Sequence, residues 1–533
     1  MSHVVRINWL EHLITSSGFI FSLLLTFFVL FLFFLFSSKA KQYYYKTSNK
    51  HKLPPSPSKL PFIGNIHHIT SSPHLSFHLL SQEYGPLMFF YLGRVPTLIV
   101  SSAAVAEAIL KTNDLVCSSR PTSRISKRLL YDNKDLVVAP YGEYWRQIRK
   151  MCMLQLLSPK RVQMYQFVRE EETALMIKMI SQKSASSLSS SSGNLVNLSE
   201  ELSLLLNNII CRVSLGKKYS EEEGGGKGYK NMINELQELL GAVDIGDHQP
   251  LLCWLKYFNG LHSRIEKSFR VTDRFLEQVI EDHVSTRNIK KKSDQEEDFV
   301  DVLLDIEKQG SIGLPFTRDN IKAIILDMFS AGTDTTYTVI EWTMAELMKH
   351  PEAMKNVQEE VRSITKGQSK VTEELIQQMH YLKSAIKETL RLHPPIPLLV
   401  PRLSTEDIKV NGYDIPAKTT IIVNAWAIGR DPDSWEEPEK FCPERFLNGG
   451  SSSEIDFKGF DFELVPFGAG RRGCPGIHLA MATVELALAN LLNEFNWEMP
   501  NGLMNEDLDM VEGTGLTVHK RSALVLLATP YVS

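Results

Sequence analysis

The sequence predicts a mainly α-helical fold with a minor β portion, preceded by one N-terminal transmembrane helix. Long apolar stretches compatible with helices cover residues 321–349 and 477–495. Short runs typical of β-strands occur at 87–92 and 97–100, and they indicate a small sheet. An almost uncharged stretch, 13–36, precedes all of them. These observations predict a membrane anchor followed by one large folded unit.

The stretch 13–36 is long enough to cross a membrane, because twenty-odd residues rising about 1.5 Å each reach roughly 30 Å. A cleaved signal peptide is the alternative, disfavoured by the length of the apolar run and by the lack of a small-x-small cleavage site. Only Arg6 precedes the stretch as an arginine or lysine, whereas five basic residues follow it: Lys39, Lys41, Lys46, Lys50 and Lys52. The positive-inside rule then places the bulk of the chain in the cytosol.

Three parts of the chain follow from this pattern. We expect a membrane anchor over 1–38, a basic and proline-rich segment over 39–65, and a large domain over 66–533, because no long Pro/Gly/Ser linker divides the last part. The net charge of −4 gives no sign of a nucleic-acid surface. The six cysteines are scattered without a disulfide framework, which is typical of a reducing compartment.

A glycine-rich loop, 466–476, places Cys474 just before an apolar helix. Pro475 suits the first turn of that helix, so the thiol is expected at a helix N-terminus, where unpaired N–H groups and the dipole stabilise a thiolate. Arg472 adds a positive charge nearby. The alternative is a buried, unreactive cysteine. Zinc or an iron–sulfur cluster would need companions, but the preceding cysteine, Cys442, lies far upstream.

The stretch Ala-Gly-Thr-Asp-Thr-Thr, 331–336, conflicts with the long helix around it. Glycine costs about 1 kcal/mol in a helix interior, and threonine is also a weak helix former. Hydroxyl and carboxylate groups can open a helix locally and admit water. A local conflict inside a strong element indicates function, although a tolerated kink is the alternative.

Two pairs of residues have helical spacing. Trp145 and Arg149 lie four apart, and Glu388 and Arg391 lie three apart, so each pair shares one helix face. Taken alone, a surface helix explains the first pair and an exposed ion pair explains the second. Asn411-Gly412 between two short runs predicts a hairpin turn.

Together these motifs resemble those of the cytochrome P450 family. The loop matches F-x-x-G-x-R-x-C-x-G, the stretch 331–336 matches A/G-G-x-D/E-T-T, and W-x-x-x-R, E-x-x-R and the later Pro-Glu-Arg-Phe at 443–446 occur in the family's order. With the proline-rich segment and Tyr-Gly-Glu-Tyr-Trp-Arg at 141–146, the chain is similar to the plant endoplasmic-reticulum A-type branch. The resemblance implies the cytochrome P450 fold, with 39–65 as a hinge and 66–533 as the catalytic domain.

The resemblance also implies roles for individual residues. Haem b is expected as cofactor, with Cys474 as the axial iron ligand. Five further residues are expected to bind the haem: Trp145, Arg149, Arg402, Phe467 and Arg472. Asp334 and Thr335 are expected to deliver protons in catalysis. Glu388, Arg391 and Arg445 are expected to form a buried structural network. The residues expected to line the substrate pocket are equally compatible with plain core: Phe329, Ala331, Ile396, Leu399 and Leu516.

The implied activity is that of a haem-thiolate monooxygenase anchored by a single span in the endoplasmic reticulum membrane, with its catalytic domain in the cytosol. It would oxidise a small hydrophobic plant specialised metabolite, with a terpenoid or a terpenoid-derived alkaloid favoured. No stretch of the chain resembles a flavin or nicotinamide domain, so O2 would be reduced with electrons from a separate NADPH–cytochrome P450 reductase. Two alternatives stay open: an oxygen-independent dehydratase or isomerase, for example on an aldoxime, and a non-catalytic haem-binding protein. The intact Asp334-Thr335 pair argues against the first, and the intact motifs argue against the second.

Overall fold

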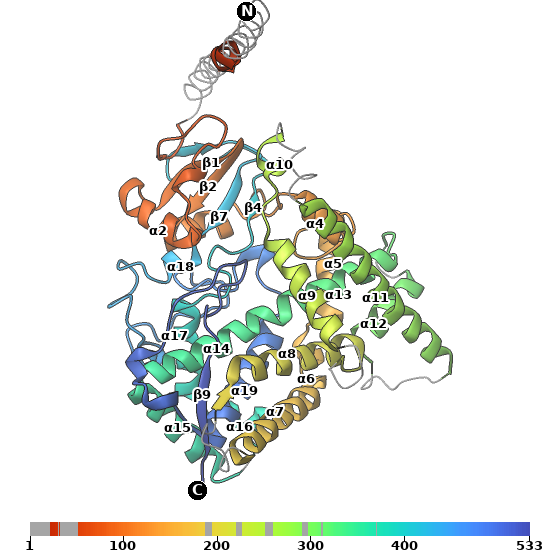
Figure 1. Cartoon of the computed structure of the whole chain (residues 1–533), viewed down its shortest axis with the longest axis vertical. Coiled ribbons are helices and arrows are strands. Elements are labelled where there is room, and N and C mark those ends of the chain that lie inside the picture. Colours follow the sequence, from red (N-terminus) through yellow and green to blue (C-terminus); the bar gives the residue numbers. More distant parts are fainter. Residues whose placement is uncertain are drawn as a thin grey trace, which may run out of the picture.

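The structure is a computed structural model that describes residues 22–29, 31, 52–186, 195–219, 226–250, 260–289, 297–310, 313–368 and 370–532. Helices make up most of the described chain, and three small sheets make up the β portion (Figure 1). The predicted mainly α fold with a minor β portion is therefore confirmed.

The helices surround a central pair, α13 (Arg318–Gly332) and α14 (Asp334–Lys349) (Figure 1). Helix α14 packs against α8 (Leu198–Leu215), α17 (His380–Leu392) and α19 (Ile477–Glu494). Most side chains of these four helices are buried, so together they form the main hydrophobic core. The other α-helices are α2 (Pro73–Tyr84), α3 (Ala103–Glu107), α4 (Arg124–Leu129), α5 (Glu143–Met151), α6 (Pro159–Met164), α7 (Gln166–Ser186), α9 (Gly226–Gly241), α10 (Ile245–His248), α11 (Leu261–Ile289), α12 (Phe299–Gln309), α15 (Pro351–Thr365), α16 (Glu373–Ile376) and α18 (Ala425–Ile428).

The largest sheet has the strand order β1-β2-β7-β4 and lies apart from the helical core (Figure 1). Strands β1 and β2 are antiparallel, β2 and β7 are parallel, and β7 and β4 are antiparallel. A second sheet has the order β3-β9-β8, and β5 and β6 form a hairpin. The strands are β1 (Leu87–Leu92), β2 (Val95–Val100), β3 (Leu195–Asn197), β4 (Arg402–Leu403), β5 (Ile408–Val410), β6 (Tyr413–Ile415), β7 (Thr420–Val423), β8 (Phe495–Glu498) and β9 (Val525–Pro530).

Several local predictions are confirmed. The runs 87–92 and 97–100 belong to β1 and β2. The β5–β6 hairpin turns at Asn411 and Gly412, whose φ angles of 49° and 78° are those that an Asn-Gly turn adopts. The helix predicted over 477–495 ends one residue earlier, because Phe495 starts β8.

The helix predicted over 321–349 is interrupted at Thr333, inside the stretch whose composition conflicts with a helix. Gly332 lies against α8 there, and a Cβ at this position would stand 2.9 Å from Cδ1 of Ile210. The absence of a side chain therefore allows α8 to approach the break closely.

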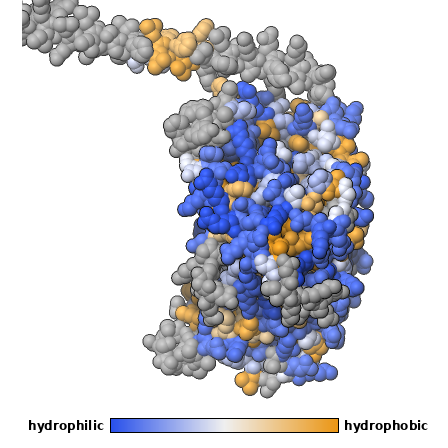
Figure 2. Space-filling view, turned by 90° about the vertical axis from the view of Figure 1, so that its right-hand side faces the viewer, coloured by the Kyte–Doolittle hydropathy of each residue, from blue (hydrophilic) through white to orange (hydrophobic). Residues whose placement is uncertain are grey.

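The predicted anchor, 1–38, lies outside the described residues apart from 22–29 and 31. These nine residues are helical and exposed, and most are hydrophobic (Figure 2). Among the described helices, none has both the length and the apolar character needed to cross a bilayer.

Candidate active site

The loop around Cys474 is held in place by its own backbone. The Cys474 amide donates to the Phe467 carbonyl at 2.9 Å, and the Gly476 amide approaches Cys474 Sγ at 3.4 Å. Gly468 and Gly470 adopt φ angles of 66° and 65°, in the left-handed region that favours glycine. The loop therefore places the partly accessible Cys474 thiol just before the N-terminal end of α19.

Two details of this loop differ from the prediction. Helix α19 starts at Ile477, so Pro475 lies in the turn before the helix, where the Gly476 amide is directed at the sulfur. Burial raises the pKa of the Cys474 thiol, whereas the Gly476 amide and the Arg149 guanidinium lower it. The positive charge that acts on the sulfur is thus that of Arg149 on α5, and not that of Arg472 as the sequence suggested.

Arg472 instead lies over the Trp145 ring, 4.0 Å from its centroid, and donates to the carbonyls of Ser118 and Ala139. Trp145 Nε1 donates to the Leu136 carbonyl at 2.9 Å. The structure therefore places these two predicted haem-binding residues in direct contact.

The other predicted arginines lie close to the cysteine loop. Arg149 donates to the Gly473 carbonyl at 2.6 Å, and Arg402 donates to the Ala469 carbonyl at 2.6 Å while pairing with Asp114 at 2.9 Å. Arg402 is thereby tied to the same loop as Cys474, although 72 positions (474 minus 402) separate them in the sequence.

Sequence reasoning missed a fourth arginine, Arg120. This buried side chain donates to three carbonyl oxygens, those of Val137, Val400 and Pro401. Its signal in the sequence was weak, because a single arginine before a proline is common in surface loops. We call Arg120, Arg149, Arg402 and Arg472 the arginine cluster.

The arginine cluster holds more positive than negative charge. Burial lowers the pKa of Arg120 well below its usual range, and the charges of Arg472, Arg402 and Arg149 lower it further. The pKa of Arg472 is lowered to about 9, mainly by burial and then by the charges of Arg402 and Arg149. Neighbouring guanidinium groups that lower one another's pKa form a site that favours an anionic ligand.

The break between α13 and α14 exposes polar groups. Thr335 Oγ1 donates to the Ala331 carbonyl at 2.5 Å, and Asp334 accepts a hydrogen bond from Thr517. Ala331 is exposed although α13 is otherwise largely buried, and Thr335 is half-buried. Two predicted catalytic residues therefore sit at an accessible point of an otherwise buried helix pair.

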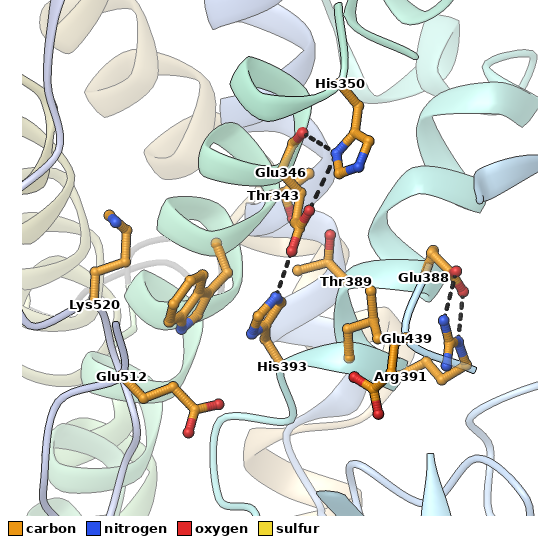
Figure 3. Close-up of polar contacts among 12 residues, drawn as sticks. Thr343, Glu346, His350, Glu388, Thr389, Arg391, His393, Glu439, Glu512 and Lys520 are labelled. Atoms are coloured by element: carbon orange, nitrogen blue, oxygen red, sulfur yellow. Dashed lines mark hydrogen bonds and ion pairs between the residues drawn. The ribbon is translucent and has the colours of Figure 1, made fainter. Parts of the chain in front are cut away.

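Glu388, Arg391 and Arg445 form the network that the sequence predicts, which we call the Glu388 network. Figure 3 shows its Glu388–Arg391 pair. Glu388 and Arg391 make two hydrogen bonds of 2.7 Å, and Arg445 Nε donates to Glu388 at 3.0 Å. All three side chains are buried. Arg391 also donates to the carbonyls of Gly429, Pro438 and Lys440. The E-x-x-R pair thus ties α17 to the chain that leads toward the cysteine loop.

Comparison with known proteins identifies the family. The family model for cytochrome P450 matches residues 54–527. This chain belongs to the cytochrome P450 family. It is 50% identical over 527 residues to cytochrome P450 736A117 of Prunus mume, covering 98% of each chain. It is 48% identical over 504 residues to norfluorocurarine oxidase of Strychnos sp, covering 93% of this chain and 96% of that one. A zebra fish cytochrome P450 structure with abiraterone superposes with a TM-score of 0.72 at 24% identity, over 87% of this chain and 100% of that one.

The protein is therefore a plant cytochrome P450 and an oxidoreductase of the monooxygenase type, with haem as its cofactor. The residues present fit that group. Cys474 offers a soft thiolate donor of the kind that haem-thiolate iron takes. The surplus guanidinium groups suit two propionate carboxylates, since planar guanidinium pairs well with carboxylate.

The predicted substrate-lining positions of this cytochrome P450 fall into two groups. Phe329 is fully buried in the core. The others are accessible: Ala331, Ile396, Leu399 and Leu516.

Contacts between segments bring Leu516 near Ile396 and Leu399 near the cysteine loop. The Val518 amide donates to the Pro395 carbonyl at 2.9 Å, next to Leu516 and Ile396. Leu399, whose φ angle is 50°, lies beside Gly468 of the cysteine loop. A Cβ added to Gly468 would stand 3.9 Å from Cδ1 of Leu399.

Proposed function

We propose that this cytochrome P450 inserts oxygen from O2 into a small hydrophobic plant specialised metabolite, with a terpenoid or a terpenoid-derived alkaloid favoured. Electrons would come from a membrane-bound NADPH–cytochrome P450 reductase. The observation that carries the proposal is the accessible Asp334-Thr335 pair at the helix break, together with the cysteine loop. The similarity to norfluorocurarine oxidase, an alkaloid-modifying enzyme by name, supports the alkaloid part.

In this proposal Cys474 would bind the haem iron through its sulfur, and the Phe467 carbonyl fixes the cysteine loop by accepting a hydrogen bond from the Cys474 amide. Trp145, Arg149, Arg402 and Arg472 would hold the haem propionates, and Arg120 would join them. Haem supplies the O–O cleavage chemistry that thiolate donation favours. The protein's own residues then have to orient the substrate, exclude water and deliver protons.

A polar pocket supports proton delivery through Asp334. It has a volume of about 420 Å³ and is lined by residues of α8, α9 and the helix break, among them Asn207, Gln237, Thr333 and Asp334. Asp334 also accepts from Thr517, which keeps its carboxylate oriented. A carboxylate that borders a polar pocket can take up protons from water and pass them to the Thr335 hydroxyl beside it.

We also propose that residues 1–38 anchor the protein in the endoplasmic reticulum membrane, that 39–65 form the hinge, and that the catalytic domain, 66–533, lies in the cytosol. The exposed apolar helical residues 22–29 support the anchor. Exposed apolar side chains support a second membrane contact, those of Leu60, Phe62, Ile63, Ile66, Val243 and Ile245. Gln249, at the end of the short helix that begins at Ile245, donates a 2.7 Å hydrogen bond to the Phe62 carbonyl and so links the two groups.

The proposal is tested by expressing the full chain in microsomes with a plant reductase and screening terpenoids and alkaloids by mass spectrometry. We expect product that depends on NADPH and O2. Product that forms equally well under strict anaerobiosis would show a dehydratase or isomerase instead. Binding of haem with no product from any substrate panel member would favour the non-catalytic alternative.

Thr335→Ala tests the proton-delivery step. The variant should bind haem and substrate normally. A positioned proton donor typically accelerates a reaction step about 100- to 10,000-fold. Without it, product formation should slow, and much of the reducing power should be released as peroxide. Peroxide formed per NADPH is the measurement. Thr338→Ala is the matched control, since Thr338 likewise donates to a carbonyl four residues earlier, that of Asp334, but is fully buried.

A further inference from the structure

The segment 135–139 supplies backbone carbonyls to the proposed haem-binding side chains. Its carbonyl oxygens accept from Arg120 Nε at 3.0 Å, from Trp145 Nε1 at 2.9 Å and from Arg472 at 3.3 and 2.5 Å. The accepting residues are Leu136, Val137 and Ala139. The position of this segment therefore sets the position of three donors at once.

Two buried carboxyl groups hold the amides of the same segment. The Leu136 amide donates to Asp327 on α13 at 2.6 Å, and the Val138 amide donates to Asp135 at 2.7 Å. Both aspartates are buried. Asp327 is thus the connection between the helix that carries the catalytic break and the segment behind the arginine cluster.

The two carboxyl groups are neighbours, because they accept from the amides of Leu136 and Val138, two residues apart in the chain. Asp135 Oδ1 is buried and receives no N–H or O–H donor from the described residues. Two ionised carboxylates in contact inside a protein repel strongly, so one of them takes up a proton. In agreement, burial and the neighbouring carboxylate raise the pKa of Asp327, and burial raises the pKa of Asp135 to about 6. A single proton shared by the two carboxyl groups would give Asp135 Oδ1 a hydrogen-bond partner.

We propose that Asp327 is a positioning residue for haem binding. It shares one proton with Asp135 and thereby holds segment 135–139 against α13. The carbonyl groups of the segment then orient Arg120, Trp145 and Arg472. The inference rests on the proposed propionate role of those side chains. Asp327 touches neither haem nor substrate in this scheme. It acts through the carbonyl groups that orient the donors.

The test compares purified full-length holoprotein of the wild type with Asp327→Asn, Asp135→Asn and Asp327→Ala. An amide at either position keeps one acceptor for the segment and donates N–H to the remaining carboxylate, so haem should be retained nearly as in the wild type. Asp327→Ala loses the acceptor and leaves Asp135 unpaired. We expect haem transfer to apomyoglobin to become about tenfold faster or more, as for loss of a buried charged hydrogen bond.

Two readouts other than activity separate positioning from general stability. Infrared spectra of the wild type should contain a protonated-carboxyl band that both asparagine variants lose. Hydrogen exchange of segment 135–139 should accelerate in Asp327→Ala and stay slow in Asp327→Asn. Asp319→Asn is the matched control, because Asp319 lies on the same helix and pairs with Lys134 at 2.7 Å, but is half exposed. It should change neither readout.

Three results would overturn the inference: wild-type haem loss in Asp327→Ala, rapid haem loss in Asp327→Asn, or a protonated-carboxyl band that survives in both asparagine variants. If the alanine variant does not fold, the infrared comparison of the asparagine variants with the wild type decides. Arg472→Ala distinguishes this inference from the proposed function. Unchanged haem loss in that variant would refute the propionate role, whereas fast loss there with slow loss in Asp327→Ala would refute only the role of Asp327.

Discussion

The arginine cluster and the Glu388 network are both largely buried and rich in arginine, but they differ in how their guanidinium groups are paired with carboxylates. In the Glu388 network two guanidinium groups converge on one carboxylate, and the remaining N–H groups meet backbone carbonyls. In the arginine cluster only one of the four guanidinium groups, that of Arg402, forms an ion pair among the described residues, with Asp114 at 2.9 Å. The first arrangement is satisfied within the protein, and the second is suited to a bound anion. Burial of charge alone therefore does not distinguish a structural site from a binding site.

The largest effect is expected from breaking the self-contained network. Glu388→Ala leaves Arg391 and Arg445 buried without their carboxylate, which should destabilise the fold by about 3–5 kcal/mol. Little folded, haem-containing protein should accumulate in microsomes. Glu359→Ala is the control, because Glu359 is an exposed partner of Lys355. A well-folded, haem-replete but slow Glu388→Ala enzyme would contradict the structural role.

A smaller effect is expected from a second self-contained group near the Glu388 network. Glu346 accepts from His393 at 2.6 Å and lies 3.3 Å from His350 (Figure 3). Burial would raise the pKa of Glu346, but hydrogen bonds from both histidines outweigh it and lower the pKa to about 2. The Glu346 hydrogen bond raises the pKa of His350 above its usual 6.5.

The signs of the two shifts define the pH dependence. The Glu346 contribution is present above pH 4.5 and is lost as the pH falls toward 2, at most about 3 kcal/mol. The His350 contribution is full below pH 6.5 and is lost as the pH rises through the raised pKa. Thermal midpoints measured across pH should therefore fall less steeply on the acid side in Glu346→Gln than in the wild type. Parallel curves would refute the assignment.

The smallest effect on stability is expected in the arginine cluster. Arg149→Gln removes one of several mutually repelling charges and one hydrogen bond, so unfolding free energy should change by less than about 1 kcal/mol. Haem loss should nevertheless accelerate about tenfold, because the substitution removes the propionate contact proposed for Arg149. Lys150→Gln, an exposed neighbour on α5, should change neither quantity. A destabilised Arg149→Gln protein with normal haem retention would show that Arg149 has a structural role and does not bind haem.

The sequence predicted those features that a local pattern encodes. The cysteine loop, the E-x-x-R pair and the helix break at 331–336 each lie within a short stretch whose composition or spacing carries the information. Arg120 could not be assigned, because its acceptors at 137 and at 400–401 lie far from it in the sequence. The partnership of Asp135 and Asp327 depends on tertiary contact in the same way, although an aspartate inside the apolar run 321–329 was a visible signal. The contacts of the Arg472 side chain also could not be predicted without the fold. Its proximity to Cys474 in the chain suggested that its charge acts on the thiol, whereas it lies over the Trp145 ring.

The left-handed backbone of Leu399 limits how this enzyme can diversify. An L-residue there stores about 1–2 kcal/mol of backbone strain, and branching at Cβ increases the crowding. If position 399 borders the substrate, valine, isoleucine and threonine are poor options for reshaping it, whereas glycine, asparagine and unbranched side chains are open. The main-chain conformation at position 399 therefore limits which single substitutions are tolerated there. It thereby limits how far such substitutions can change the substrate range.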